Sequence, residues 1–235
     1  MYGKTIIKVN NIYEGYKLKI FFNRFGVNAQ VLNPELPLNT QRQILQSFTM
    51  AHFDYLIILG NEKGLHVKHV RNAIFFNTAA NYGEYSKVVN KVSFEEGYII
   101  TMLNGPEDED ALNKLQAKQK EHLGGVLFTE LPVKRHILSA FNYRVTDAIR
   151  SVTSQAIKAE KARELKKQIL GSKKLKKYFE EHPQEKEIIA KDLNKGKELE
   201  YRFADLKSIP DYLLPKESLL ANPVEEVRKE TFNPI

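Results

Sequence analysis

The sequence has no cysteine at any of its 235 positions. This absence excludes disulfide bonds, thiolate zinc sites and cysteine nucleophiles, and it fits a reducing compartment, so redox chemistry is not expected. The chain also lacks an apolar run close to the roughly 18 residues that a membrane-spanning helix needs. Its first residues, MYGKTIIKVNN, have neither the long apolar core nor the small-residue cleavage site of a signal peptide. These absences predict a soluble intracellular protein without a membrane partner.

Metal-binding patterns are also missing. His66 and His69 stand two residues apart in GLHVKHV, but no carboxylate with ligand spacing lies near them. The acidic stretch GPEDEDALNKL lacks the ligand spacing and central glycine of a calcium loop, and it predicts the acidic first turn of a helix instead. We therefore expect no metal site.

Positive charge is present and is concentrated in one segment. Residues from Lys134 to Lys177 include thirteen lysines and arginines against three acidic residues, which gives this segment a net charge of +10. The whole chain carries only +7, so the remainder is slightly acidic. A near-neutral body with a polybasic segment indicates an anionic partner such as nucleic acid.

The first half of the sequence alternates strand-like runs with helical spacing. Five short apolar runs have the character of strands: KTIIKVN, VNAQVLN, FDYLIILG, VRNAIFFN and GYIITML. Gly26 is predicted to cap the end of the first helix, and Asn39 or Thr40 the start of the second. Strands that alternate with helices form parallel sheets covered on both faces, so residues 1–130 are predicted to form one α/β domain with a mostly parallel sheet.

The sequence after LPVKR has helical spacing. Apolar residues recur at three- and four-residue steps from Phe141 to Gly171, which predicts one helix, and SKKLKKYFEEHP predicts a shorter helix that ends near Pro183. We expect a basic helical extension over residues 131–183. Residues 184–235 are predicted to be a mixed polar docking segment, which contains IPDYLLP, and a loosely held tail.

Two long stretches resemble a known family. GYKLKIFFNRFGVNAQVLNPELPLNTQRQILQSFTMAHFDYLI closely resembles the second RecA-like domain of DEAD-box ATP-dependent RNA helicases, in particular a nucleolar subfamily that acts in large ribosomal subunit assembly. YRVTDAIRSVTSQAIKAEKARELKKQILGSKKLKKYFEEHP and IPDYLLP resemble the carboxy-terminal extension of that subfamily. The resemblance spans Thr5 to Pro215 and implies a three-layer RecA-like domain followed by the extension.

The chain departs from the family at the residues that use ATP. It contains no G-x-x-x-x-G-K-[ST] and no DEAD sequence, so the first RecA-like domain is not represented in it. Lys8 stands where the family has an aromatic residue in IFVN, Gln41 precedes Arg42 where the family has arginine, and Leu59 and Gly60 stand in place of ATD. The family segment YIHRAGRTAR reads YSKVVNKVSF, with Val88, Lys91 and Phe94 at arginine positions.

These degenerate positions predict an inactive relative. The resemblance implies that two of the arginines stabilise the phosphoryl charge, and the loss of such an arginine costs on the order of 10³ or more in rate. We therefore expect no catalytic residue and no cofactor, with ATP and Mg²⁺ bound only if a separate first domain completes the enzyme.

The leading hypothesis is a non-catalytic RNA-binding protein that acts with ribosomal RNA or a pre-ribosomal particle in large-subunit biogenesis. Phosphate contacts from the basic segment would give salt-sensitive binding. The sequence KKLKK is also typical of a nuclear localisation patch, so we expect a nuclear and nucleolar location. Three candidates come from the resemblance and ten from the basic segment. The predicted RNA-binding residues are Asn10, Asn39, Arg42, Arg144, Arg150, Lys158, Lys161, Lys166, Lys167, Lys173, Lys174, Lys176 and Lys177.

Two alternatives remain open. In the first alternative, the chain is half of a split or truncated ATP-dependent RNA helicase and works with a separate protein that supplies the first RecA-like domain. In the second it is a protein-interaction scaffold on an assembly particle, where it meets ribosome-assembly proteins. The predicted docking residues are Ile209, Pro210, Asp211, Tyr212 and Leu213.

Overall fold

A five-stranded parallel sheet forms the centre of the protein. The structure is a computed structural model that describes residues 3–59, 67, 70–92, 97–123, 128–172 and 174–198. The strands are β1 (Thr5–Lys8), β2 (Ala29–Val31), β3 (Tyr55–Ile58), β4 (Asn72–Phe75) and β5 (Tyr98–Thr101). Their order across the sheet is β2-β3-β1-β4-β5, and every neighbouring pair is parallel. All five predicted strands and the parallel sheet are confirmed.

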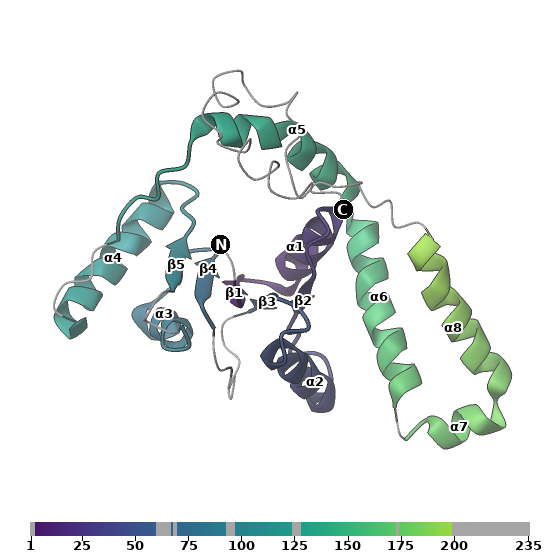
Figure 1. Cartoon of the computed structure of the whole chain (residues 1–235). Coiled ribbons are helices and arrows are strands. Elements are labelled where there is room, and N and C mark those ends of the chain that lie inside the picture. Colours follow the sequence, from purple (N-terminus) through teal and green to yellow (C-terminus); the bar gives the residue numbers. More distant parts are fainter. Residues whose placement is uncertain are drawn as a thin grey trace, which may run out of the picture.

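Helices cover both faces of this sheet. They are α1 (Ile12–Arg24), α2 (Leu38–Thr49), α3 (Tyr82–Val89), α4 (Pro106–Leu123), α5 (Arg135–Ser151), α6 (Ser154–Gly171), α7 (Lys176–Glu181) and α8 (Pro183–Glu198). Figure 1 shows α1 on one side of the sheet and α2 and α3 on the other. Helix α5 crosses from the β5 side to the β2 side, and α6, α7 and α8 lie beyond β2.

Alternate residues of the strands supply two separate cores. Ile6 packs with Phe48 of α2 and Phe75 of β4 on one face, whereas Ile7 packs with Tyr16 of α1 and Ile157 of α6 on the other. A strand that is apolar on both faces is the pattern of a parallel sheet between two helical layers. The three-layer RecA-like fold is therefore confirmed, and α6 contributes to one of its cores.

Helix α1 packs close to the sheet because it carries a glycine on its inner face. Asn11 caps its start, with Oδ1 accepting from the Glu14 N–H at 2.8 Å. A Cβ on Gly15 would lie only 3.3 Å from Cγ1 of Val31. Gly26 follows the helix with φ of +67°, so the predicted capping glycine is confirmed.

Helix α2 begins earlier than predicted. Its first residue is Leu38 and its N-cap is Pro37, so the prediction of Asn39 or Thr40 as the cap is wrong. The physical reason is that the carbonyl of Pro37 accepts from the backbone N–H groups of Thr40 at 2.9 Å and Gln41 at 3.1 Å, which places Asn39 and Thr40 inside the first turn.

The predicted helix from Phe141 to Gly171 is two helices. Helix α5 ends at Ser151 and α6 begins at Ser154, because Thr153 is extended and its Oγ1 accepts from the Ala156 N–H at 3.2 Å. This side-chain cap starts a new helix in the middle of the apolar repeat. The predicted stop at Gly171 is confirmed.

Part of the predicted docking segment is helical. Helix α8 occupies Pro183–Glu198 and packs against α6 and α7, in a stretch where the sequence pattern indicated only mixed polar residues. The predicted short helix before Pro183 is confirmed as α7. The predicted docking residues Ile209 to Leu213 lie outside the described residues.

Replacing Gly15 with leucine should destabilise the domain by about 1–3 kcal/mol, because the side chain has no room between α1 and the sheet. Gly171→Leu is the matched control, since a Cβ at Gly171 meets nothing within 4 Å and leucine favours a helix. Urea unfolding of both variants measures the difference. Equal stability of the two variants would contradict the close packing of α1.

Candidate functional site

The carboxyl ends of the central strands carry the first group of predicted RNA contacts. Asn10 is the second residue after β1 and is exposed; its backbone N–H donates to Oδ1 of Asn77 at 3.0 Å. Lys8 is buried beneath it, where its ammonium donates to Oδ1 of Asn10 at 2.7 Å and lies 3.0 Å from Oε1 of Glu84 on α3. The lysine that replaces an aromatic residue therefore orients Asn10 and joins β1 to α3.

Two further residues on this side of the sheet lie on α2. Asn39 and Arg42 are exposed in the first turns of the helix, so both are accessible to a ligand. Leu59, which follows β3, is half-buried, and Gly60 lies outside the described residues. The structure thus places Asn10, Asn39 and Arg42 on accessible surface without showing what they bind.

Of the three positions predicted to be degenerate, Val88 lies on α3 and packs in the core. Val88 is only 2% exposed and lies in the core with Phe75 and Tyr85. Lys91 is half-buried just after the helix, and Phe94 lies outside the described residues. Burial raises the pKa of Tyr85 to about 12, and the neighbouring Tyr82 adds to this rise. An arginine in place of Val88 would have to enter this apolar environment.

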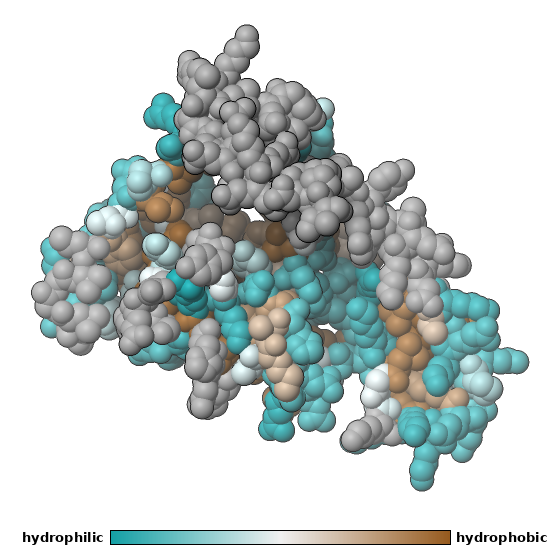
Figure 2. Space-filling view, in the orientation of Figure 1, coloured by the Kyte–Doolittle hydropathy of each residue, from teal (hydrophilic) through white to brown (hydrophobic). Residues whose placement is uncertain are grey.

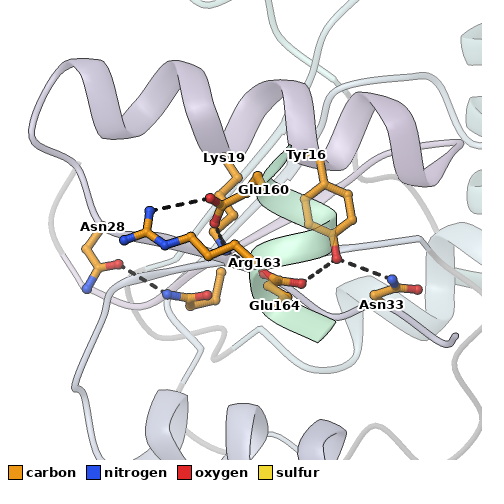
Figure 3. Close-up of polar contacts among 8 residues, drawn as sticks. Tyr16, Lys19, Asn28, Asn33, Glu160, Arg163 and Glu164 are labelled. Carbon is orange, nitrogen blue, oxygen red and sulfur yellow. Dashed lines mark hydrogen bonds and ion pairs between the residues drawn. The ribbon is translucent and has the colours of Figure 1, made fainter. Parts of the chain in front are cut away.

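A buried charge network fixes the extension to the domain (Figure 3). Lys19 of α1 is 5% exposed, and its ammonium lies 2.9 Å from Oε1 of Glu160 and 2.5 Å from Oε1 of Glu164 on α6. The hydroxyl of Tyr16 donates to Oε2 of Glu164 and accepts from Nδ2 of Asn33 at 3.2 Å. Five buried or half-buried polar groups from three segments thus satisfy one another.

The contacts of the network keep Lys19 and Glu160 charged and keep the hydroxyl of Tyr16 protonated. Burial alone would lower the pKa of Lys19, but Glu164 and Glu160 outweigh it, so the pKa is raised. Burial likewise opposes ionisation of Glu160, yet Lys19 and then Arg163 lower the pKa of this carboxyl. Burial and the bond to Glu164 raise the pKa of Tyr16, which keeps its hydroxyl a donor.

Three further contacts align α6 with α1, with α2 and with the loop before α2. Lys161 lies 5.6 Å from the centre of the Tyr16 ring and 3.8 Å from Oε2 of Glu35, and Gln168 accepts from Thr40. Lys161 is therefore held against the domain.

The other basic residues of the predicted set differ in their exposure to solvent. Arg144 and Lys166 are half-buried, and Lys173 lies outside the described residues. Arg150 forms an ion pair with Asp147 at 3.6 Å, which is weak because both side chains are exposed. The exposed cations among the predicted set are Arg42, Arg150, Lys158, Lys167, Lys174, Lys176 and Lys177. Figure 2 shows hydrophilic surface over the lower part of the helices beyond β2, with an apolar strip between α6 and α8.

Sequence reasoning missed the residues that attach α6. The signal was present, because Glu160 and Glu164 are the only acidic residues of a basic helix and their four-residue spacing places them on one face. Lys19 also interrupts the apolar inner face of α1. A charge on an apolar helical face needs a partner, but the sequence does not name which one.

No group of metal-ligating side chains exists in the described part of the chain, and His66 and His69 lie outside it. None of the described helices combines the length and the apolar character that crossing a bilayer requires.

Comparison with known proteins relates this architecture to one family. No family model matches the sequence. Similar relatives include the ATP-dependent RNA helicase DBP9 of Meyerozyma guilliermondii, 29% identical over 268 residues, and the DEAD-box ATP-dependent RNA helicase 16 of Oryza sativa subsp. japonica, 30% identical over 252 residues. The alignments cover 91% and 90% of this chain. The chain is homologous to the DEAD-box ATP-dependent RNA helicases.

The homology covers less than half of each helicase. The chain spans 45% of the Meyerozyma protein and 37% of the Oryza protein. Among solved structures, the C-terminal domain of a variant of S. cerevisiae Dbp5 bound to Gle1 and IP6 matches with a TM-score of 0.50 over 64% of this chain and 85% of that chain. The second DEAD-box helicase domain of Mss116p bound to an RNA duplex matches with a TM-score of 0.51 over 75% and 67%. At sequence identities of 16% and 14%, these two matches show similarity of fold alone.

Replacing Lys19 with methionine should destabilise the docking of α6 by about 3–5 kcal/mol, because Glu160 and Glu164 lose their main counter-charge while buried. Lys17→Met is the matched control, since Lys17 is exposed on the same helix. Hydrogen exchange of the α6 amides measures the loss of protection. Unchanged protection in the Lys19 variant would contradict the attachment described above.

The contribution of the network to the free energy of unfolding should decrease at both low and high pH. The lowered pKa of Glu160 means that its stabilisation is complete above about 4.3, the ordinary glutamate pKa, and is lost as the pH falls through the folded value. The raised pKa of Lys19 means that its stabilisation is complete below about 10.4 and is lost as the pH rises through the folded value. Urea unfolding should therefore separate wild type from Lys19→Met at pH 7, and the difference should shrink as the pH falls below about 4.3. A constant difference would contradict this.

Proposed function

We propose that the chain is an RNA-binding protein without ATP hydrolysis of its own, which acts on pre-ribosomal RNA in nucleolar assembly of the large ribosomal subunit. The observation that carries the proposal is the packing of Val88 in the core, at a position where the family resemblance puts an arginine. A buried valine cannot stabilise the charge of a transferring phosphoryl group. Ribosomal RNA is proposed as the ligand because both the domain and the extension resemble the ribosome-assembly subfamily.

Other residues of this edge support the same conclusion. Lys8 is buried against Glu84, so its charge is neutralised inside the protein. Asn10, Asn39 and Arg42 remain exposed and present amide and guanidinium donors. Donors of this kind bind RNA phosphates, sugars and unpaired bases without a nucleotide.

The exposed cations of the extension supply the electrostatic part of binding. Lys174, Lys176 and Lys177 are exposed at the start of α7, and Lys158 is exposed on α6. Because α6 is fixed to the domain and packs against α8, these charges are carried on helices attached to the domain rather than on a free arm. Phosphate neutralisation by such residues gives strong dependence on salt and little on sequence.

A split or truncated helicase is the second candidate. The specific observation in its favour is that the chain spans only 37–45% of the two relatives described above, which are named as ATP-dependent RNA helicases. A separate first RecA-like domain would then supply the phosphate-binding loop. The two candidates differ in whether ATP hydrolysis appears when such a domain is added.

Docking on ribosome-assembly proteins through Ile209 to Leu213 stays a prediction. These residues lie outside the described part of the chain. A nuclear location is proposed because of the sequence KKLKK. Its residues Lys174, Lys176 and Lys177 are exposed, which a transport receptor would need in order to bind them.

The proposal is tested by RNA affinity and ATP hydrolysis measured on one preparation of the full chain. Binding to single-stranded RNA should weaken about 100-fold between 50 and 200 mM salt if about five phosphates are contacted, and ATP should neither be hydrolysed nor change the affinity. RNA-stimulated hydrolysis by the chain alone would overturn the non-catalytic part. Absence of any RNA binding would overturn the rest.

Substituting glutamine for Lys174, Lys176 and Lys177 should reduce the slope of log affinity against log salt by about 2, since each lysine contributes about 0.7 on single strands. The matched control replaces three exposed lysines of α4, at the opposite end of the molecule in Figure 1. The control residues are Lys114, Lys118 and Lys120. Equal slopes for both triple variants would mean that RNA binds by general charge and not at the extension.

A further inference from the structure

A polar cavity runs along the free edge of the sheet, where α6 covers β2. Its volume is about 460 Å³, within the size range of small-ligand sites. Helices α1, α2 and α6 form its walls, and β2 with the segment before it forms its floor. The cavity does not include Asn10 or Arg42, so it is separate from the surface already described.

The cavity is lined by more positive than negative side chains. Three positive side chains, Lys19, Arg163 and Lys167, line it against two carboxylates, Glu160 and Glu164. Both carboxylates bind the ammonium of Lys19, and Arg163 lies 3.7 Å from Oε2 of Glu160, which is beyond hydrogen-bond distance. The charge of the carboxylates is thus directed mainly at Lys19.

Lys167 is the cation of this cavity that takes no part in the ion pairs of Glu160 and Glu164 with Lys19. It lies one helical turn after Arg163, so both side chains extend from the same face of α6. In the part of the chain that the structure describes, Lys167 forms no ion pair. Partial desolvation, and after it the positive charges of Arg163 and Lys19, lower the pKa of Lys167. An anion placed between the two side chains would relieve this repulsion.

The rest of the lining supplies neutral hydrogen-bonding groups. Asn28 and Gln30 lie on the β2 side, Gln168 on α6, and His52 on the loop before β3. Figure 3 shows Arg163 extending from α6 toward Asn28. Carboxamides both donate and accept, so they can meet the hydroxyl and ring groups of a phosphorylated organic ligand.

From this geometry we propose that the cavity between α6 and β2 binds a phosphate group held by Arg163 and Lys167, with the carboxamides around it contacting the attached nucleoside. Arginine binds phosphate oxygens through two parallel N–H donors, and lysine adds a point charge. The phosphate can belong to a free nucleotide or to an RNA strand, and the proposal does not depend on which. It therefore stands independently of the RNA-binding function proposed above.

The test is nuclear magnetic resonance of the isotope-labelled full chain, titrated separately with inorganic phosphate, a nucleoside monophosphate and a short single-stranded RNA. Saturable shifts of the side-chain signals of Asn28, Gln168 and His52 are expected. The double variant Arg163→Gln, Lys167→Gln should bind the ligand at least about tenfold more weakly. The matched control, Lys114→Gln with Lys118→Gln, removes the same charge from exposed positions of α4 outside the cavity and should leave cavity binding unchanged.

The outcomes separate the two sources of phosphate. Shifts with the mononucleotide identify a free-ligand site, and shifts with RNA alone assign the cavity to a nucleotide of a bound strand. Absence of cavity shifts with all three probes, or equal weakening in both double variants, overturns the proposal. RNA binding that shifts only signals outside the cavity overturns it while leaving the proposed function intact.

Discussion

The ammonium of Lys19 enclosed by two carboxylates is the interaction on which the arrangement of the carboxy-terminal helices depends. It fixes both the rotation and the position of α6, because Glu160 and Glu164 must face α1 while Ile157 enters the core. A buried ion network is rarely a large source of net stability, since desolvation offsets most of its attraction. Its effect is specificity, because any other rotation of α6 would bury one of these charges without a partner.

The other helices beyond β2 follow from this attachment. Helix α8 packs on α6, and α7 connects the two, so their exposed lysines take positions set by α6. The same attachment closes the free edge of β2, which would otherwise present unpaired backbone groups. Beyond the apolar contact at Ile157, α6 turns long polar side chains toward α2, and the cavity with Arg163 and Lys167 lies among them.

At the carboxyl ends of the strands, the side chains of Val88 and Lys8 are both held within the domain. Val88 fills the core and the charge of Lys8 is neutralised by Glu84, so both side chains stabilise the domain. Each is compatible with the fold because it has a complementary environment, apolar for Val88 and acidic for Lys8.

The sequence alone determined the parallel α/β fold, the position of each strand and the concentration of charge, because strands and helices follow the local periodicity of apolar residues. It also determined the capping glycine after α1, since a helix that ends in a residue with positive φ favours glycine there. The break at Thr153 escaped prediction because a side-chain cap overrode an apolar repeat that continued through it. Tertiary structure alone decided which face of α6 is buried and hence which lysines remain free. The reason is that Lys19 and Glu164 are separated by 145 positions, and only the folded chain brings them together.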